Sequence, residues 1–103
     1  MANPPQLTDD QRRAALAKAA EARTARAEVR EALGTGALSL SELLDQSDDD
    51  LIGGIKVKAI LTALPGLGKV KSFRLMDELG ISENRRLRGL GRKQREALLA
   101  ALS

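Results

Sequence analysis

Helix-forming residues make up most of this chain, and residues that favour β-strands are scarce. Ala, Leu, Arg, Glu and Lys dominate the 103 residues, and Phe73 is the only aromatic residue. No segment alternates apolar and polar residues with the period of two that a half-buried strand requires. Because the common residues have high helix propensity, we expect an all-α fold without a sheet.

Capping and stop signals divide the chain into separate helices. Thr8 and Gln11 have the spacing of a capping box and predict the start of a long helix, which Gly34 is expected to end after Leu33. Apolar repeats and glycines then predict a short helix capped by Ser39 or Ser41, helices over 55–64, 69–79 and 92–102, and a loop over 81–91.

These elements predict two regions. Residues 1–37 form a long N-terminal helix and its connector, and residues 38–103 form a compact helical domain against which that helix packs. Within the second region, residues from about 65 to 102 form a hairpin, a helix, a long turn and a final helix. No repeat of 20–50 residues is visible.

The residue types that are missing exclude most enzyme chemistry. The chain has no Cys, His, Trp or Tyr, so thiolate nucleophiles, imidazole bases, disulfides and the usual zinc sites are ruled out. Asp48, Asp49 and Asp50 are interpreted as part of a turn, because adjacent carboxylates point in different directions. We therefore expect no catalytic residues, no metal, no cofactor and no small-molecule substrate.

Residues 1–7 contain no basic segment followed by an apolar run, and no stretch approaches the about 20 apolar residues that span a bilayer. A cytoplasmic protein without a membrane partner is therefore expected. Charge is divided unevenly along it. Residues 1–50 hold 6 basic and 10 acidic side chains, whereas residues 51–103 hold 11 basic and 4 acidic ones. The second half is therefore predicted to bind a polyanion.

The segment from Leu64 to Lys71 carries the strongest functional signal. Gly66 and Gly68 flank one leucine, which allows a tight turn in which Leu67 packs inward while backbone N–H groups face an anion. An ordinary Pro-Gly turn between packed helices is the structural alternative. A nucleotide-binding loop is excluded, because Ala63 stands where such a loop needs glycine and Val70 follows the lysine.

Cations open three of the predicted helices, although the helix dipole favours acidic residues there. An external phosphate at those helix ends would account for this placement, whereas lysine stems that cover apolar neighbours at a screened surface are the alternative. The pairs concerned are Lys56 and Lys58, Lys69 and Lys71, and Arg92 and Lys93.

Arginines gather in two further places. One stripe on the first helix falls within a sector of about 60° at 100° per residue and comprises Arg12, Arg23, Arg26 and Arg30. It is interpreted either as a second nucleic-acid surface or as a solvated helix face. The other group lies in the predicted loop, where glycines let the backbone approach a phosphate, and comprises Arg85, Arg86, Arg88 and Gly89. A solubilising run is the alternative there.

Five segments together carry a family likeness: Gln6-Leu7-Thr8, Ile55-Lys56-Val57-Lys58, Leu64-Pro65-Gly66-Leu67-Gly68-Lys69-Val70-Lys71, Met76-Asp77-Glu78-Leu79 and Arg85-Arg86-Leu87-Arg88-Gly89-Leu90-Gly91. The hairpin resembles the helix-hairpin-helix motif. Pro65 to Leu102 resembles the helix-two-turn-helix module that a ribosomal small-subunit protein shares with certain DNA-repair glycosylases. Nearly the whole chain is similar to the actinobacterial integration host factor family.

That resemblance implies a nucleoid-associated protein that binds double-stranded DNA with little sequence preference, shapes the chromosome and assists phage integrase. It implies that Arg85, Arg86 and Arg88 correspond to the family's arginine motif, and Gly66, Gly68 and Lys69 to its backbone-binding hairpin. The heterodimeric, sheet-armed factor of enteric bacteria is unrelated, so its bending mechanism does not transfer. No bend angle follows from the likeness.

We therefore expect a non-enzymatic, monomeric duplex-DNA-binding protein of the nucleoid. The expected DNA-binding residues are Gly66, Leu67, Gly68, Lys69, Lys71, Arg85, Arg86, Arg88, Gly89, Arg92 and Lys93, with Arg12, Arg23, Arg26 and Arg30 as a second surface. Two alternatives remain open at this point. One is an RNA-binding or ribosome-associated protein, and the other is a protein-interaction adaptor whose basic half serves as an anchor.

Overall fold

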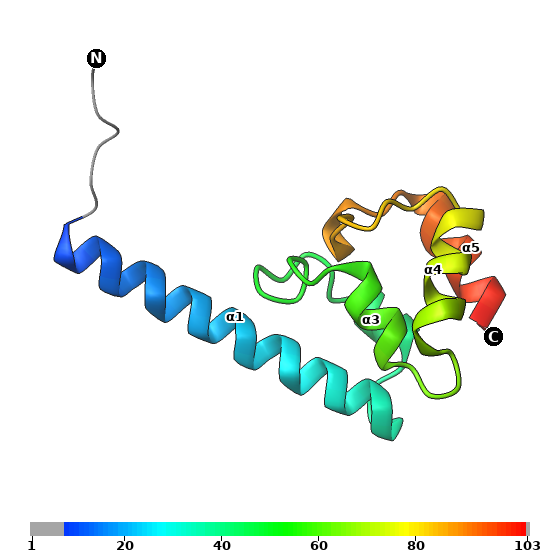
Figure 1. Ribbon diagram of the computed structural model, residues 1–103, viewed down its shortest axis with the longest axis horizontal. Helices are drawn as coiled ribbons and strands as arrows, with labels where there is room; N and C mark the ends of the chain where they lie inside the picture. The colour runs from blue at the N-terminus through cyan, green and yellow to red at the C-terminus, as the bar shows by residue number, and fades with distance from the viewer. Residues whose placement is uncertain (1–7, 103) are drawn as a thin grey trace, which may run out of the picture.

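The computed structural model describes residues 8–102 and confirms the all-helical prediction. Its elements are α1 (Asp9–Thr35), α2 (Leu40–Leu44), α3 (Val57–Ala63), α4 (Gly68–Glu78), the 3₁₀ helix η1 (Leu87–Gly89) and α5 (Arg92–Leu102). Helices α2 to α5 gather into a compact body, and α1 extends away from it (Figure 1). Gln6 and Leu7 of the family likeness lie outside the described residues.

Helix α1 begins as expected and ends later than expected. The Thr8 hydroxyl accepts a hydrogen bond from the Gln11 N–H (3.1 Å), and the Gln11 side chain accepts one from the Thr8 N–H (3.0 Å). The predicted stop at Gly34 is wrong, because the helix continues to Thr35 and Gly36 adopts the left-handed conformation with φ 82°. Gly34 stays helical and lies close to α3, where an added Cβ would sit 3.7 Å from the Ala63 carbonyl oxygen.

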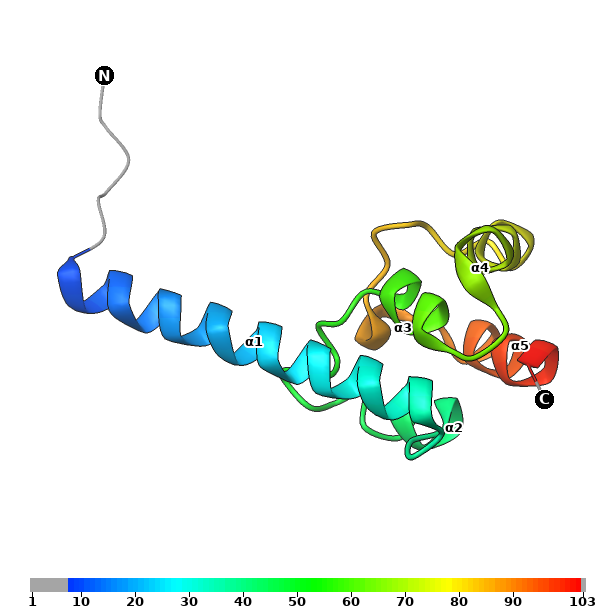
Figure 2. The same cartoon turned by 60° about the horizontal axis from the view of Figure 1, so that its bottom comes forward.

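Only the C-terminal part of α1 is anchored. All residues from 8 to 24 are exposed, whereas Val29 and Leu33 are buried in the core. Two views show the first turns extending free of the body (Figures 1 and 2). The radius of gyration, 16.1 Å, therefore exceeds the about 13 Å expected for a compact chain of this length.

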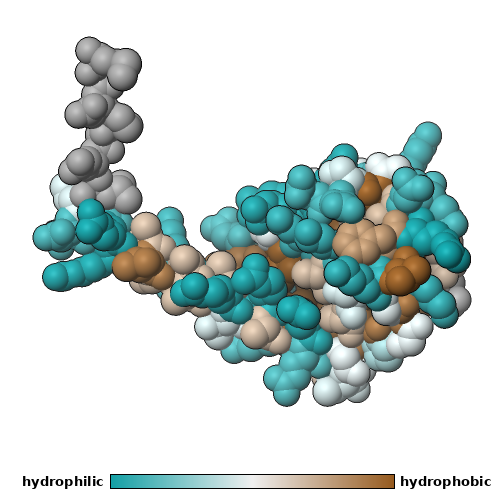
Figure 3. Space-filling view, in the orientation of Figure 1, coloured by the Kyte–Doolittle hydropathy of each residue, from teal (hydrophilic) through white to brown (hydrophobic). Residues whose placement is uncertain are grey.

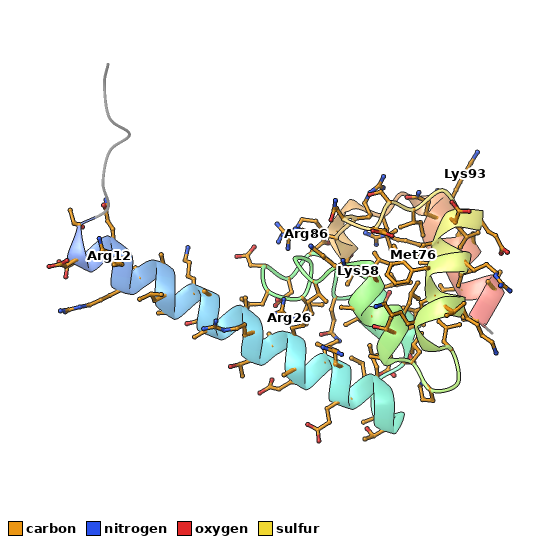
Figure 4. All side chains as sticks on the ribbon, viewed as in Figure 1. Arg12, Arg26, Lys58, Met76, Arg86 and Lys93 are labelled. Atoms are coloured by element: carbon orange, nitrogen blue, oxygen red, sulfur yellow. The ribbon has the colours of Figure 1, made fainter. Side chains whose placement is uncertain are left out.

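One hydrophobic core joins all the helices. Helix α3 packs against both α1 and α4, and α2 contacts α5. Met76 of α4 points into this core, as Figure 4 shows. The other large side chains that are almost fully buried are Leu33, Leu43, Ile60, Leu61, Leu87 and Leu98. Such burial stabilises the fold by roughly 1.5–3 kcal/mol for each large side chain.

The connections follow local chemistry. Ser39 caps α2 in a capping box with Glu42, which decides between the two serines that the sequence offered. The Asp49 carboxylate accepts hydrogen bonds from the N–H groups of Leu51 and Ile52, so this aspartate organises a turn. After α4, Gly80 takes a φ of 69° and ends that helix as predicted.

Two expected boundaries differ because distant segments pair. The helix predicted over 55–64 begins only at Val57, since Lys56 is extended and its neighbours pair with the segment from Arg85 to Leu87. Val57 N–H donates to the Arg85 carbonyl and Leu87 N–H donates to the Ile55 carbonyl, each at 2.9 Å. The expected loop over 81–91 therefore contains this bridge as well as η1.

Candidate nucleic-acid interface

Two cations face each other where the distant segments pair. Lys56 and Arg86 are the partners of an isolated antiparallel β-bridge. Like charges directly opposite one another across such a pair are destabilising. Arg86 is held there by a hydrogen bond from its Nη1 to the Gly54 carbonyl oxygen. The backbone therefore places two cationic residues opposite each other, an arrangement that an external anion would stabilise.

These two residues belong to a larger basic furrow between α1 and the body. The furrow consists of two adjoining open hollows of about 500 and 450 Å³ that share Arg30, Lys58 and Ala59. Its six cations are Arg26, Arg30, Lys56, Lys58, Lys69 and Arg86. None of the described residues that line it is acidic.

Helix α1 forms one wall of the basic furrow. Arg26 and Arg30 lie one turn apart near the anchored end of the helix, and Val29 between them is buried in the core. Arg26, Lys58 and Arg86 line one hollow, and Figure 4 shows Arg26 on α1 and the other two on the body. Hydrophilic side chains crowd this face of the molecule (Figure 3). Burial of Val29 thus positions two of the four arginines of the predicted stripe.

The hairpin before α4 adjoins the furrow and has the predicted conformation. Gly66 and Gly68 have φ values of 78° and 73°, which residues with a side chain rarely adopt. Leu67 packs against the core, as expected. Helix α4 has no side-chain cap and no acidic residue in its first turn, so its first N–H groups can donate hydrogen bonds to an anion. Lys69, from that turn, lines the furrow.

Capping differs between the two halves of the described chain. Helices α1 and α2 both have capping boxes and acidic first turns. Helices α3 and α4 have neither, and cations stand at their starts. Because the same chain caps two helices fully, the uncapped and cationic starts agree with an anion-binding role for this half.

The three arginines of the predicted loop have different surroundings. Arg85 is half-buried, and its Nη1 donates to the Gly89 carbonyl oxygen at 2.8 Å and to the Gln94 side chain at 3.1 Å. Arg88 is exposed, and its Nη2 donates to the Asp50 carbonyl oxygen at 3.0 Å. Of the three, Arg86 alone lines the furrow.

Other residues predicted for the site lie apart from the furrow. Arg12 stands at the far end of α1, and Lys93 lies on the other side of the body (Figure 4). Arg23 does not line either hollow, and Lys71 lines a different one beside Leu64 and Leu102. Arg92 pairs with Glu96 at 3.3 Å, the one ion pair within residues 8–102.

Lys56 and Lys58 line the furrow but are not among the predicted binding residues, because the sequence marks them only as cations at a helix start. Phe73 has no predicted role, although its side chain lines the furrow beside Lys58 and Lys69. The placement of cations at helix starts is the sequence pattern that could have identified both lysines as binding residues. No sequence pattern pairs position 56 with position 86.

Residues 8–102 lack two features that would indicate other functions. No helix in this part of the chain has both the length and the apolar character needed to cross a membrane. The same residues contain no group of three or more Asp, Glu, His or Cys side chains that could hold a metal ion.

Comparison with known proteins places the fold in a family. The S13-like H2TH domain family matches residues 33–102. Integration host factors from Mycobacterium tuberculosis and Mycolicibacterium smegmatis are each 55% identical over 96 residues, covering 92% of this chain and 91% of theirs. The chain belongs to the integration host factor family of actinobacteria. The integration host factor of Streptomyces coelicolor is 54% identical over 95 residues, covering 91% of this chain and 88% of its own.

A solved structure of a related integration host factor agrees with this assignment. It is sIHF bound to an 8-bp palindromic DNA, and it is 47% identical with a TM-score of 0.80. The match covers 84% of this chain and 98% of that chain. The S13-like H2TH match begins at Leu33, two residues before the end of α1. The end of α1 is therefore included in the match.

Proposed function

We propose that this chain is a non-enzymatic protein that binds duplex DNA through the phosphate backbone with little sequence preference. The observation that carries the proposal is the basic furrow, where Lys56 and Arg86 are held opposite each other among six cations without a lining acid. Phosphates would offset the repulsion among these cations. A backbone contact of this kind positions DNA and reads no base.

The hairpin extends the proposed contact surface. Gly66 and Gly68 expose the backbone at the start of α4, and Lys69 connects this start to the furrow. We assign direct phosphate contact to the hairpin, to Arg86 and to the furrow lysines. Arg26 and Arg30 are the part of the α1 stripe that joins them, and Arg88, Arg92 and Lys93 are assigned to a peripheral contact.

The relatives support a cellular role for this binding. Three similar proteins are named integration host factor, and one related structure contains DNA. We propose that the chain acts as a monomer in the nucleoid, shapes chromosome topology and assists phage integrase on supercoiled DNA. RNA or ribosome binding, which the H2TH module alone would allow, is an outcome of the experiment below.

The test is fluorescence anisotropy across a salt series with two unrelated duplexes of about 30 bp and one RNA hairpin. If about five phosphates are neutralised, the logarithm of affinity falls with the logarithm of salt concentration at a slope near −4.5. The two duplexes are expected to bind alike. Affinity that does not depend on salt, or a clear preference for the RNA hairpin, would contradict the proposal.

A charge-matched pair of variants locates the contact. Lys56→Ala/Arg86→Ala removes two furrow cations and is expected to flatten the salt slope by about two. Arg13→Ala/Lys18→Ala removes the same charge from the exposed start of α1 and is expected to leave the slope nearly unchanged. Equal effects of both pairs would show that net charge rather than the furrow drives binding.

A further inference from the structure

The only aromatic side chain of the chain lies in the basic furrow rather than in the core. Phe73 is half-buried and lines the hollow of about 450 Å³ together with Arg30, Lys58 and Lys69. Ten other half-buried apolar side chains of the described residues pack against the core, and Phe73 is not among them. Packing of the body therefore leaves the position of this ring unexplained.

Helix geometry explains how the ring reaches the furrow. Ser72 and Met76 are almost fully buried and mark the inner face of α4. Phe73 follows Ser72 by one residue, which turns its side chain by about 100° around the helix axis. This rotation carries the ring from the core toward the wall that faces α3 and α1. The hollow there has a size typical of small-molecule sites, about 300–1,000 Å³.

An aromatic face among cations is the combination that binds unpaired nucleotides. Sites for single-stranded nucleic acid join a positively charged groove to aromatic side chains on which bases stack. In a paired duplex the base faces are covered by neighbouring bases, so a ring beside the phosphates has no base face to contact. The cations alone would serve a duplex, and the ring adds a function that only an unpaired base can use.

We propose that the furrow also takes unpaired DNA, with one base stacked on Phe73 and the flanking phosphates held by Lys58, Lys69 and Arg30. The inference rests on the proposed function in one respect, namely that the ligand is DNA. It predicts that a single strand, or a duplex with an internal bubble, gains a contact that a fully paired duplex cannot make.

Fluorescence at position 73 tests the stack directly. Because the chain has no Trp or Tyr, Phe73→Trp creates a single emitter, and stacking of a base on it is expected to quench the emission. The probes are a 12-nucleotide oligothymidine and a blunt duplex. Val70→Trp is the matched control, since Val70 lies on the same helix and is 73% exposed without lining the furrow.

The proposal is supported if the single strand quenches the tryptophan emission of the Phe73→Trp variant and changes that of the Val70→Trp variant little. Equal responses at both positions, no quenching by the single strand, or quenching by the paired duplex alone would overturn it. The last result would indicate a wedge inserted between paired bases.

Affinity measured with Phe73→Leu provides the second readout. This variant keeps an apolar side chain and removes the aromatic face. The ratio of single-strand to duplex affinity is expected to fall about 5- to 150-fold, the range for loss of one base–aromatic stack. If the wild-type chain binds duplex DNA and the ratio is unchanged in Phe73→Leu, the stacking proposal is contradicted and the proposed function is not. Absence of wild-type duplex binding would instead contradict the proposed function.

Discussion

Neighbouring arginines that look equivalent in the sequence have different roles in the folded chain. Arg85 reaches Gln94, whose Oε1 also accepts from the Gly91 N–H and whose Nε2 donates to the Gly80 carbonyl oxygen. This network ties the loop to the end of α4 and the start of α5. Gly89 leaves room for it, because an added Cβ would sit 3.0 Å from the Arg85 Cδ. Arg86 instead lines the furrow.

Single substitutions should separate these roles. Arg85→Ala is expected to lower the free energy of unfolding by about 1–2 kcal/mol, because it removes two hydrogen bonds at a partly buried position. Arg86→Ala is expected to change stability less and to reduce the salt slope of DNA binding by about one. Urea denaturation followed by circular dichroism measures the first effect, and anisotropy measures the second.

The Arg85→Lys variant is a control that keeps the charge and loses the planar guanidinium. It should resemble Arg85→Ala in stability and the unsubstituted chain in salt slope. A salt slope that falls by about one in Arg85→Ala and is retained in Arg85→Lys would show that Arg85 contacts phosphate itself.

At the scale of elements, two glycines show how a helix end is chosen. Gly34 and Gly36 both follow the apolar repeat of α1, and only Gly36 has a positive φ, 82°. Its N–H donates to the Leu33 carbonyl oxygen at 3.4 Å. The sequence offers two stops two residues apart, and the helix ends at the second, because Gly34 stays helical and only Gly36 takes the left-handed conformation.

Alanine at these two glycines is expected to change the free energy of unfolding in opposite directions. Gly34→Ala is expected to raise the free energy of unfolding by about 0.5–1 kcal/mol, because alanine loses less backbone entropy in a helix and its Cβ makes an ordinary contact. Gly36→Ala is expected to lower it by about 1–2 kcal/mol, because the left-handed conformation crowds a Cβ. Urea denaturation of both variants checks the pair, and destabilisation by Gly34→Ala alone would contradict the observed helix end.

At the scale of the whole molecule, anchoring divides α1 into two parts. The first turns are fully exposed, whereas Val29 and Leu33 share one core with α2 to α5. The boundary predicted after residue 37 stays a prediction, and the shared core places the last turns of α1 in contact with the body. Stability is therefore expected to be uneven along a single continuous helix.

Amide hydrogen exchange should show this gradient. Backbone amides near the start of α1 are expected to exchange through local fraying, because no tertiary contact holds that end. Amides near Val29 and Leu33 are expected to exchange only when the body unfolds. Uniform protection along α1 would contradict this expectation.

Removal of residues 1–18 is a control for the exchange experiment. The shortened chain should keep its free energy of unfolding within about 0.5 kcal/mol, since the described part of this segment, residues 8–18, is exposed throughout. Its far-ultraviolet circular dichroism should lose only the helical signal of the missing turns. A larger loss of stability would mean that the exposed part supports the body.

Local information accounts for what could be predicted. The absence of strand patterns, the capping box at Thr8, the stop at Gly80 and the start of α5 at Arg92 all depend on residues a few positions apart, and the structure agrees with each. The division of charge also indicated which half of the chain would carry the cations. The hairpin glycines indicated where its backbone would be exposed. Propensity and capping act over one helical turn, so the sequence alone was sufficient for these features.

The furrow depends on contacts between residues that are far apart in the chain. Lys56 meets Arg86 because the backbone pairs across 30 positions, and Arg26 and Arg30 reach them because burial of Val29 and Leu33 docks α1 on α3. Hydrophobic burial is non-directional and leaves no local pattern that says which faces will meet. The choice of six furrow cations from 17 lysines and arginines therefore came from the packed chain, whereas the helices that carry them followed from the sequence.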